Sequence, residues 1–403
     1  KKYLSVGVNP WSERAPLDRV DPPPNRWGGR REAFLTKPRL RLTMSRRSWN
    51  LAAASLVIGL TWLPFSAVRA VELGPSLVGA TTTEQHVLVT GETPNRLAVL
   101  DGTGSQLLTS VDLPGQPGLP VSNRKGTEVF IPIFSTGEVV SIDPNTGERQ
   151  WSVKVGRGPK SASLDPSQKQ LYVPNSLDST VSVVDIRSRA VIATIPTGSN
   201  PVAVTVHPNR ARAYVANACS VDITIVNTRR MRAMTTLKAC GLPLRPVLSA
   251  SGKRAFISCR GSGTVAVIDT TRNALARIIP VGSKPAPPAL TRDAKRLFVP
   301  LEGEAAVSVI QLPSGKVTGK VSVGEAPTTA TLNRTGRLLF VPNRSGATVS
   351  VVNVNRLQVT RTVPTQPSPV QVVIGARPLV ITESGSVTEI PEVSTTEEMT
   401  PPE

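Results

Sequence analysis

Residues 201–240 read PVAVTVHPNRARAYVANACSVDITIVNTRRMRAMTTLKAC, and this stretch decides the fold. It contains four short segments rich in β-branched and apolar residues, Val202–Val206, Ala213–Ala216, Asp222–Val226 and Ala233–Leu237, which polar turns separate. Segments of this length and composition between turn residues are typical of β-strands. The stretch therefore predicts four antiparallel strands joined by tight turns.

The same pattern recurs along the chain with a constant period of 42 residues. One bulky anchor occupies the same position in each of seven units: Leu88, Phe130, Tyr172, Tyr214, Phe256, Phe298 and Phe340. A proline stands thirteen residues before each anchor: Pro75, Pro117, Pro159, Pro201, Pro243, Pro285 and Pro327. A unit of four strands cannot bury both of its faces alone, so copies must pack against one another around an axis. We therefore expect an all-β protein, a β-propeller of four-stranded antiparallel blades.

The number of blades depends on the residues after the seventh unit. Strand-like segments continue in VQVVI from Val370, PLVIT from Pro378 and SVTEI from Ser386. These segments would supply three strands of an eighth blade, and Val71–Leu73 would supply the fourth, because a propeller closes its ring when both ends of the chain complete one blade. Eight blades are favoured, with seven as the alternative.

Several repeat signatures resemble those of a known family. They are YVPN at Tyr172, YVAN at Tyr214 and FVPN at Phe340, followed by VSVVD at Val181, TVAVID at Thr264 and TVSVVN at Thr348. These are similar to the repeats of YVTN-family β-propellers, which are secreted or surface proteins related in fold to lactonase-type and cytochrome d1-type propellers. The resemblance spans Pro75 to Ile390, with departures in FISC at Phe256 and FVPL at Phe298. It implies the fold and leaves the activity open.

The two ends of the chain differ from the repeats. Residues 1–43 are rich in Arg and Pro and are predicted to be disordered or untranslated. Residues 44–70 have the basic, apolar and small-residue zones of a signal peptide, and an uncleaved membrane anchor is the alternative. The propeller is expected over 71–390, followed by a disordered acidic tail over 391–403. Cleavage after Ala70 would leave 34 basic and 24 acidic residues, a net charge of +10 against +19 for the whole chain.

Successive strands run in opposite directions, so the loops divide between two faces. We call the face with the second-to-third-strand loops and the blade-to-blade links the link face, and the face with the first and third turns the turn face. Basic residues gather in the first turns: Arg212, Lys253, Arg254, Lys295, Arg296 and Arg337. Such a field predicts attraction to polyanions, and a solvated face that keeps a secreted protein soluble is the alternative. Nucleic acid is not expected as a partner, because the chain is predicted to be exported and the turns lack interleaved aromatic residues.

Three cysteines, Cys219, Cys240 and Cys259, fall near one corner of the link face. In an oxidising compartment one disulfide and one remaining thiol are expected, and both Cys219–Cys240 and Cys240–Cys259 are feasible. A three-thiolate metal site is the less favoured alternative, because no nearby histidine completes a usual ligand set.

Five carboxylates of the link face are candidate ligand-binding residues: Glu302, Glu304, Glu325, Asp178 and Asp222. They are scattered over several blades without the paired spacing that catalysis requires, and the two histidines, His86 and His207, lie apart. The sequence therefore predicts no catalytic residue, no metal and no cofactor. It favours an exported, non-catalytic and monomeric scaffold, secreted or periplasmic at the cell envelope, with no membrane span after cleavage. Its partner would be an unidentified protein or a cell-envelope polymer. The alternative is a lactonase-like or quinoprotein-like enzyme that uses carboxylates around the central channel.

Overall fold

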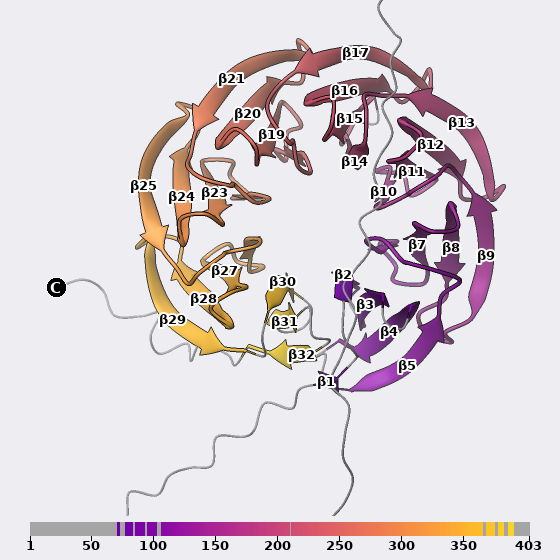
Figure 1. Cartoon of the computed structure of the whole chain (residues 1–403), viewed down its shortest axis with the longest axis horizontal. Coiled ribbons are helices and arrows are strands. Elements are labelled where there is room, and N and C mark those ends of the chain that lie inside the picture. Colours follow the sequence, from indigo (N-terminus) through magenta and orange to yellow (C-terminus); the bar gives the residue numbers. More distant parts are fainter. Residues whose placement is uncertain are drawn as a thin grey trace, which may run out of the picture. The chain divides into compact units, whose positions relative to one another are not determined.

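The computed structural model describes residues 71–72, 77–83, 85–92, 95–102, 106–209, 211–365, 368–374, 378–382 and 386–390. The segments predicted over 1–43, 44–70 and 391–403 lie outside the described residues. The described residues form eight four-stranded antiparallel sheets arranged as blades around a central channel (Figure 1). The prediction of an eight-bladed propeller is confirmed.

The strands follow the chain from blade to blade. Blades 1 and 2 comprise β2 (Leu77–Thr82), β3 (His86–Glu92), β4 (Asn95–Asp101) and β5 (Leu107–Asp112), then β6 (Val121–Ser122), β7 (Val129–Ile133), β8 (Glu138–Ile142) and β9 (Arg149–Lys154). Blades 3 and 4 comprise β10 (Ser163–Leu164), β11 (Gln170–Asn175), β12 (Thr180–Asp185) and β13 (Ala190–Pro196), then β14 (Pro201–Val206), β15 (Arg212–Asn217), β16 (Asp222–Asn227) and β17 (Arg232–Lys238). Blades 5 and 6 comprise β18 (Val247–Leu248), β19 (Arg254–Cys259), β20 (Thr264–Asp269) and β21 (Ala274–Pro280), then β22 (Ala289–Leu290), β23 (Arg296–Leu301), β24 (Ala306–Gln311) and β25 (Lys316–Ser322). Blades 7 and 8 comprise β26 (Thr331–Leu332), β27 (Leu338–Asn343), β28 (Thr348–Asn353) and β29 (Gln358–Pro364), then β30 (Pro369–Ile374), β31 (Pro378–Thr382), β32 (Ser386–Glu389) and β1 (Val71–Glu72).

Blade 8 closes the ring with both ends of the propeller sequence. Strand β1 pairs with β32, with Val71 opposite Val387 and Glu72 opposite Ser386. On the channel side, the amide of Gln371 accepts a hydrogen bond from the backbone N–H of Ala80 in blade 1, at 3.3 Å. The closure is therefore made at the outer edge by β1 and at the inner edge by the Gln371 side chain.

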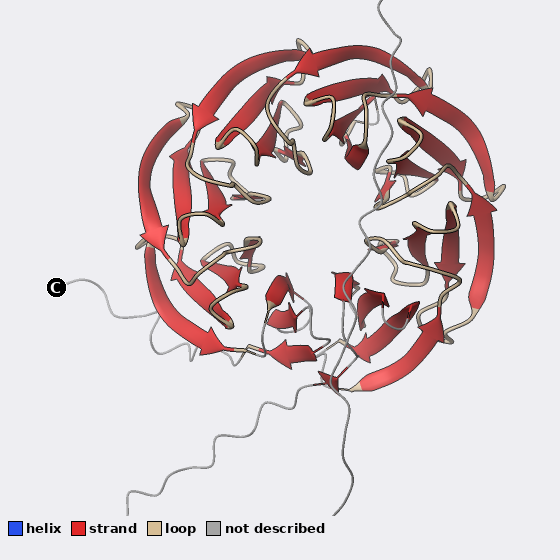
Figure 2. Ribbon diagram, viewed as in Figure 1, coloured by secondary structure: helices blue, strands red, loops and turns tan. Residues whose placement is uncertain are grey.

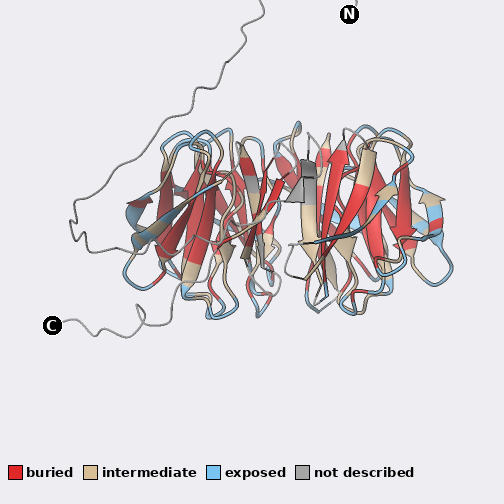
Figure 3. Cartoon of the chain, turned by 90° about the horizontal axis from the view of Figure 1, so that it is seen from below, coloured by how far each residue is buried: buried red, intermediate tan, exposed pale blue. Residues whose placement is uncertain are grey.

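The hydrophobic core lies between the blades. The described buried residues form eight clusters, and each cluster joins two neighbouring blades. All seven anchors belong to this core, and none is more than 3% exposed. Figure 3 shows the ring edge-on, with buried strands between two layers of exposed loops. Because a blade buries its surface only against its neighbours, the eight seams hold the ring together.

The loops divide between the two faces as the strand order requires. In Figure 2 the innermost strands border the central channel, and the outermost strands form the rim.

In the part of the chain that the structure describes, no helix has the length and apolar character needed to cross a membrane.

Candidate functional site at the channel mouth

The loops that follow the second strand of each blade begin four residues after the anchor, on the link face. In blades 2 to 7 the residues at this repeat position are Phe134, Ser176, Ala218, Arg260, Glu302 and Arg344. Three consecutive blades thus contribute charged residues, and blade 2 contributes a phenyl ring. We call this ring of positions, with the exposed residues of the adjoining innermost strands, the channel mouth.

Glu302 is held between two arginines of the neighbouring blades. One carboxylate oxygen, Oε2, pairs with Nη1 of Arg260, and the other, Oε1, accepts a hydrogen bond from Nη2 of Arg344 at 2.8 Å. The hydrogen bond from Arg260 lowers the pKa of Glu302, and the charge of Arg344 acts in the same direction. The Glu302 side chain is only 13% exposed. This carboxylate is therefore ionised and neutralised, which leaves it poorly suited to act as a base or metal ligand.

Asp178 and Glu304 occupy one repeat position and fix the preceding blade-to-blade link. Asp178 accepts hydrogen bonds at 2.6 Å from the backbone N–H and from Nε of Arg157. Glu304 accepts the backbone N–H of Ser283 at 2.5 Å and pairs with Lys320. The backbone N–H and the guanidinium of Arg157 lower the pKa of Asp178, and hydrogen bonds from Lys320 and Ser283 lower the pKa of Glu304. Both carboxylates are thus engaged in holding the links.

The two remaining carboxylates do not join these groups. Asp222 is buried and accepts hydrogen bonds from Asn217 at 2.7 Å and from the Ser220 hydroxyl at 3.0 Å. Glu325 is exposed in the link before blade 7, and its side chain makes no hydrogen bond or ion pair with the described residues. Among the residues that the structure describes, no three His, Cys, Asp or Glu side chains are grouped so that they could hold a metal ion.

Arg245 is a cation beside the channel that has no partner among the described residues. Arg245 follows Pro243 on the channel-side edge of blade 5, and its side chain is exposed. It makes no hydrogen bond or ion pair within the described part of the chain. The next residue, Pro246, is tied to the innermost strand of blade 4 by a hydrogen bond from Thr205 to its carbonyl at 2.8 Å. Arg245 is therefore exposed at the inner edge of blade 5, beside the channel. Desolvation by the surrounding protein lowers the pKa of Arg245, although a guanidinium stays charged at neutral pH.

Farther around the channel, blades 2, 3 and 4 line an apolar pocket of about 430 Å³. Pro117, Leu119, Phe134 and Val202 form its apolar walls, and Lys160 stands at its edge. The Lys160 ammonium lies 5.5 Å from the centre of the Phe134 ring, within the range of a cation–π contact. The channel mouth thus combines an unpaired guanidinium, an ammonium and an apolar wall.

The cysteine corner lies at the link between blades 4 and 5. The structure joins Cys240 to Cys259, with 5.5 Å between their Cα atoms, and this is one of the two pairings expected from the sequence. Cys219 is free and exposed, and its sulfur accepts a hydrogen bond from Asn200 at 3.3 Å. The corner therefore supplies one cross-link and one thiol.

Both histidines are found at the turn face, away from the channel mouth. His86 begins β3 after the first turn of blade 1 and is 7% exposed. His207 lies in the first turn of blade 4, where its ring hydrogen bonds with the carbonyl of Gly252 at 2.8 Å. Burial lowers the pKa of His86. Neither residue is available as a ligand for a group bound at the link face.

The basic residues of the turn face divide into two groups. Arg212 donates to the carbonyl of Thr270, and Arg296 donates to the carbonyl of Val354, in each case from one blade to the third turn of the next. Lys253, Arg254 and Lys295 are exposed. Some of the basic residues predicted on this face therefore connect neighbouring blades through hydrogen bonds.

Several residues of the channel mouth were not predicted from the sequence. Arg260 and Arg344 stand one period before and one period after Glu302, so the repeat register already aligned the three residues. Arg245 likewise shares its register with Leu119, Ser161 and Ala203, and is the only charged residue among the described residues at that position. Comparing the same position across all units would have found both features.

Comparisons with known proteins bear on the fold. No family profile and no curated protein sequence matches the chain. Among solved structures, hydrazine synthase from Kuenenia stuttgartiensis has 22% identity and a TM-score of 0.55, covering 68% of this chain and 95% of its own. The dihydro-heme d1 dehydrogenase NirN, in complex with DHE, has 16% identity and a TM-score of 0.65, covering 78% of this chain and 74% of its own. A functionally unknown protein from Desulfotomaculum acetoxidans has 13% identity and a TM-score of 0.57, covering 69% of this chain and 95% of its own. At these identities the likeness concerns the fold, and the propeller implied by the YVTN-family resemblance is confirmed.

Proposed function

We propose that the protein is an exported, non-catalytic propeller of the cell envelope that binds a partner at the channel mouth. The partner, a protein or an envelope polymer, presents a carboxylate carried on an apolar body. The observation that carries this proposal is the state of three of the five link-face carboxylates, because Glu302, Glu304 and Asp178 are each neutralised by a basic side chain. A propeller enzyme that used these groups would need at least one of them free for a metal or a proton.

The ligand class is set by the groups that remain free. The guanidinium of Arg245 has N–H donors that no described residue accepts. A carboxylate could accept two of these hydrogen bonds at once. The pocket around Phe134 and Leu119, which blades 2 to 4 line, supplies apolar area at the same mouth. A ligand with one anionic group and an apolar portion would satisfy both sides of the mouth.

Phenylacetate is a suitable probe, and its binding to the mature protein can be followed by ligand-observed NMR. The variant Arg245→Gln should bind it about tenfold more weakly, because a charge-assisted hydrogen bond is lost. Arg229→Gln, on the turn face, removes the same charge and should leave binding unchanged. Equal affinity in the wild type and Arg245→Gln would contradict the proposal.

The enzymatic alternative has its own test. Purified protein would be assayed for lactone hydrolysis with Ca²⁺, Mn²⁺ or Zn²⁺ added, and for quinone-dependent dye reduction. We expect no turnover above the buffer rate. Metal-stimulated hydrolysis that disappears in Glu302→Gln would replace the binding function with catalysis.

Export is tested at the amino terminus. When the chain is produced in a secreting host, N-terminal sequencing of the exported protein should begin at Val71. Protein that stays in the membrane with its leader uncleaved would favour the anchored alternative.

A further inference from the structure

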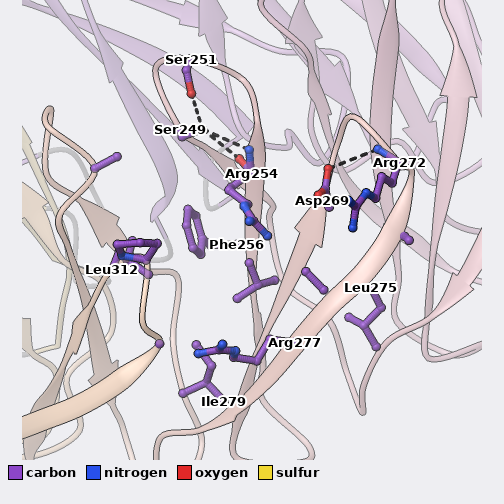
Figure 4. A pocket seen from close by; sticks show the side chains of 16 residues that line it. Ser249, Ser251, Arg254, Phe256, Asp269, Arg272, Leu275, Arg277, Ile279 and Leu312 are labelled. Atoms are coloured by element: carbon purple, nitrogen blue, oxygen red, sulfur yellow. Dashed lines mark hydrogen bonds between the residues drawn. The ribbon is translucent and has the colours of Figure 1, made fainter.

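A second cavity lies between blades 5 and 6, at the turn face (Figure 4). Its volume is about 490 Å³. Blade 5 contributes the first turn, the third turn and β21, and blade 6 contributes its third turn and Ala294. This cavity shares no lining residue with the channel mouth, and we call it the 5/6 pocket.

A comparison of equivalent repeat positions explains why no arginine bridges blades 5 and 6 across this pocket. Arg212, Arg254 and Arg296 occupy the same position in blades 4, 5 and 6, two residues before the anchor. Arg212 and Arg296 each reach 58 residues ahead to a backbone carbonyl of the next blade, at Thr270 and Val354. The corresponding acceptor for Arg254 is Leu312, and no hydrogen bond joins them.

The turn that would receive Arg254 differs from its equivalents. It carries Pro313 where blade 5 has Thr271 and blade 7 has Asn355. Instead of tying blade 5 to blade 6, the Arg254 side chain lines the 5/6 pocket. Its guanidinium makes no hydrogen bond with the described residues.

Two further arginines line the same pocket. Arg277, on β21, extends toward the third turn of blade 6, where a Cβ at position 315 would lie 2.4 Å from its Nη1. Gly315 therefore leaves the space that the guanidinium occupies. Arg272 lies in the third turn of blade 5 beside Asp269, the one acidic residue in the lining. Three guanidinium groups and one carboxylate give the pocket a net charge of +2.

The rest of the lining is largely apolar. Phe256 is buried beneath Arg254 and faces Leu312, and Ile279 lies beside Arg277 (Figure 4). Leu275 adds apolar surface along β21. A bound molecule would thus meet arginine side chains and an aromatic and aliphatic surface next to one another.

The 5/6 pocket has a counterpart two blades earlier in the propeller, which provides a natural comparison. A cavity of about 360 Å³ between blades 3 and 4 is lined by the corresponding positions, with Gln170 in place of Arg254 and Asp165 in place of Ser249. Asp165 accepts backbone hydrogen bonds from Lys169 and Gln170 within its own turn. This counterpart contains a carboxylate and one arginine, Arg229, so it lacks the excess positive charge of the 5/6 pocket.

From this arrangement we propose that the 5/6 pocket is a binding site for a phosphomonoester carried on an aromatic or aliphatic body. A phosphomonoester has close to two negative charges at neutral pH, which matches the pocket charge, and its oxygens accept paired hydrogen bonds from arginine. The apolar lining receives the organic part of the ligand. This inference is independent of the function proposed for the channel mouth.

Phenyl phosphate is the probe, and isothermal titration calorimetry on the mature protein is the measurement. We expect phenyl phosphate to bind at least about tenfold more tightly than inorganic phosphate or phenyl sulfate, because neither combines the dianion with an aromatic ring. Arg254→Gln, which introduces the residue found at position 170, should weaken binding at least about tenfold. Arg277→Gln should have a similar effect. Both variants should fold normally, since neither guanidinium hydrogen bonds within the described protein, and circular dichroism checks this.

Matched controls separate the site from general charge. Arg229→Gln removes one arginine from the counterpart pocket and should leave phenyl phosphate binding to the 5/6 pocket unchanged. Three results would each overturn the proposal: no binding by the wild type up to about 10 mM phenyl phosphate, unchanged affinity in Arg254→Gln, or an equal loss in Arg229→Gln.

Discussion

At the scale of single residues, blade 5 differs from blades 3, 4 and 7 at two positions of the repeat. In blades 3 and 7 a link glycine lies against a buried asparagine, and a Cβ on Gly156 or Gly324 would come within 2.6 or 2.7 Å of Asn175 or Asn343. Blade 4 repeats the pair with Gly198 and Asn217. Blade 5 has Cys240 and Cys259 at these two positions, and they form the disulfide. The cross-link thus replaces a close glycine–asparagine contact between a link and the strand beside it.

Removing this cross-link should lower stability. Cys259→Ser is expected to cost about 2–4 kcal/mol in free energy of unfolding, measured by guanidinium denaturation without reductant. The double variant Cys240→Gly with Cys259→Asn should recover part of that loss, because the introduced asparagine would gain Thr264 as an acceptor, as Asn175 has Thr180. Cys219→Ser is the control and should be neutral, since Cys219 is free and exposed. A double variant no more stable than Cys259→Ser would argue against the replacement.

The Arg260–Glu302–Arg344 triad predicts a pH dependence. The pKa of Glu302 is lowered in the folded protein, so its stabilising effect is complete above the ordinary glutamate pKa of about 4.3 and is lost as pH falls through the lower folded value. Glu302→Gln should cost about 1–2 kcal/mol at neutral pH, because it removes the carboxylate charge with which two partly exposed guanidinium groups form ion pairs. Unfolding of both proteins from pH 7 downward is the measurement, and the difference should shrink below pH of about 4. A difference independent of pH would exclude the ion pairs as its cause.

At the scale of elements, the sequence predicted the strands of a complete unit to within one residue at each end. The segments expected at Val202–Val206 and Ala213–Ala216 are β14 and β15, which extend over Pro201–Val206 and Arg212–Asn217. Apolar periodicity and turn residues are local properties, so a single unit contained enough information. The lengths of the innermost strands were harder to predict. In blades 2, 5 and 6 these strands have only two residues, and each follows a proline, such as Pro120 or Pro246. Proline has no backbone N–H and so cannot donate a hydrogen bond to the neighbouring strand. Blades 3 and 7 show the same shortening without a proline, and nothing in the structure explains it.

The shortest outer strand makes a prediction about closure. In the other blades the fourth strand has six or seven residues, whereas β1 contributes only Val71 and Glu72 to blade 8. A chain that starts at residue 73 loses this pairing and should unfold about 2–4 °C earlier in calorimetry than one that starts at residue 71. A chain over residues 71–390 is the control and should match one over residues 71–403. An unchanged midpoint in the shortened chain would mean that the seam with blade 1 and Gln371 closes the ring without β1.

At the scale of the whole molecule, the ring places together residues that the sequence separates widely. The triad joins blades 5, 6 and 7, and the open 5/6 pocket exists because one arginine in three lacks the acceptor that its equivalents have in the next blade. The sequence revealed the shared register of these residues, but their contacts depend on the rotation between blades, which no single unit specifies. This is why the sequence could align these residues by their repeat position but could not predict which of them are in contact.

The distribution of charge over the two faces makes the last prediction. The exposed lysines Lys253 and Lys295 lie in first turns on the turn face, beside arginines that are partly used to connect blades. If this face docks on an anionic envelope polymer, the mature protein should be retained on immobilised heparin at low salt and released as ionic strength approaches about 0.15 M, where the Debye length falls to about 8 Å. Lys253→Gln with Lys295→Gln should elute at lower salt than the wild type. Lys238→Gln with Lys284→Gln removes the same charge from the link face and should elute with the wild type. Retention that does not respond to salt would contradict docking through the turn face, and so would equal shifts in elution of the two double variants. The turn face would then be an ordinary solvated surface, because docking through that face requires its own lysines to contribute more than those of the link face.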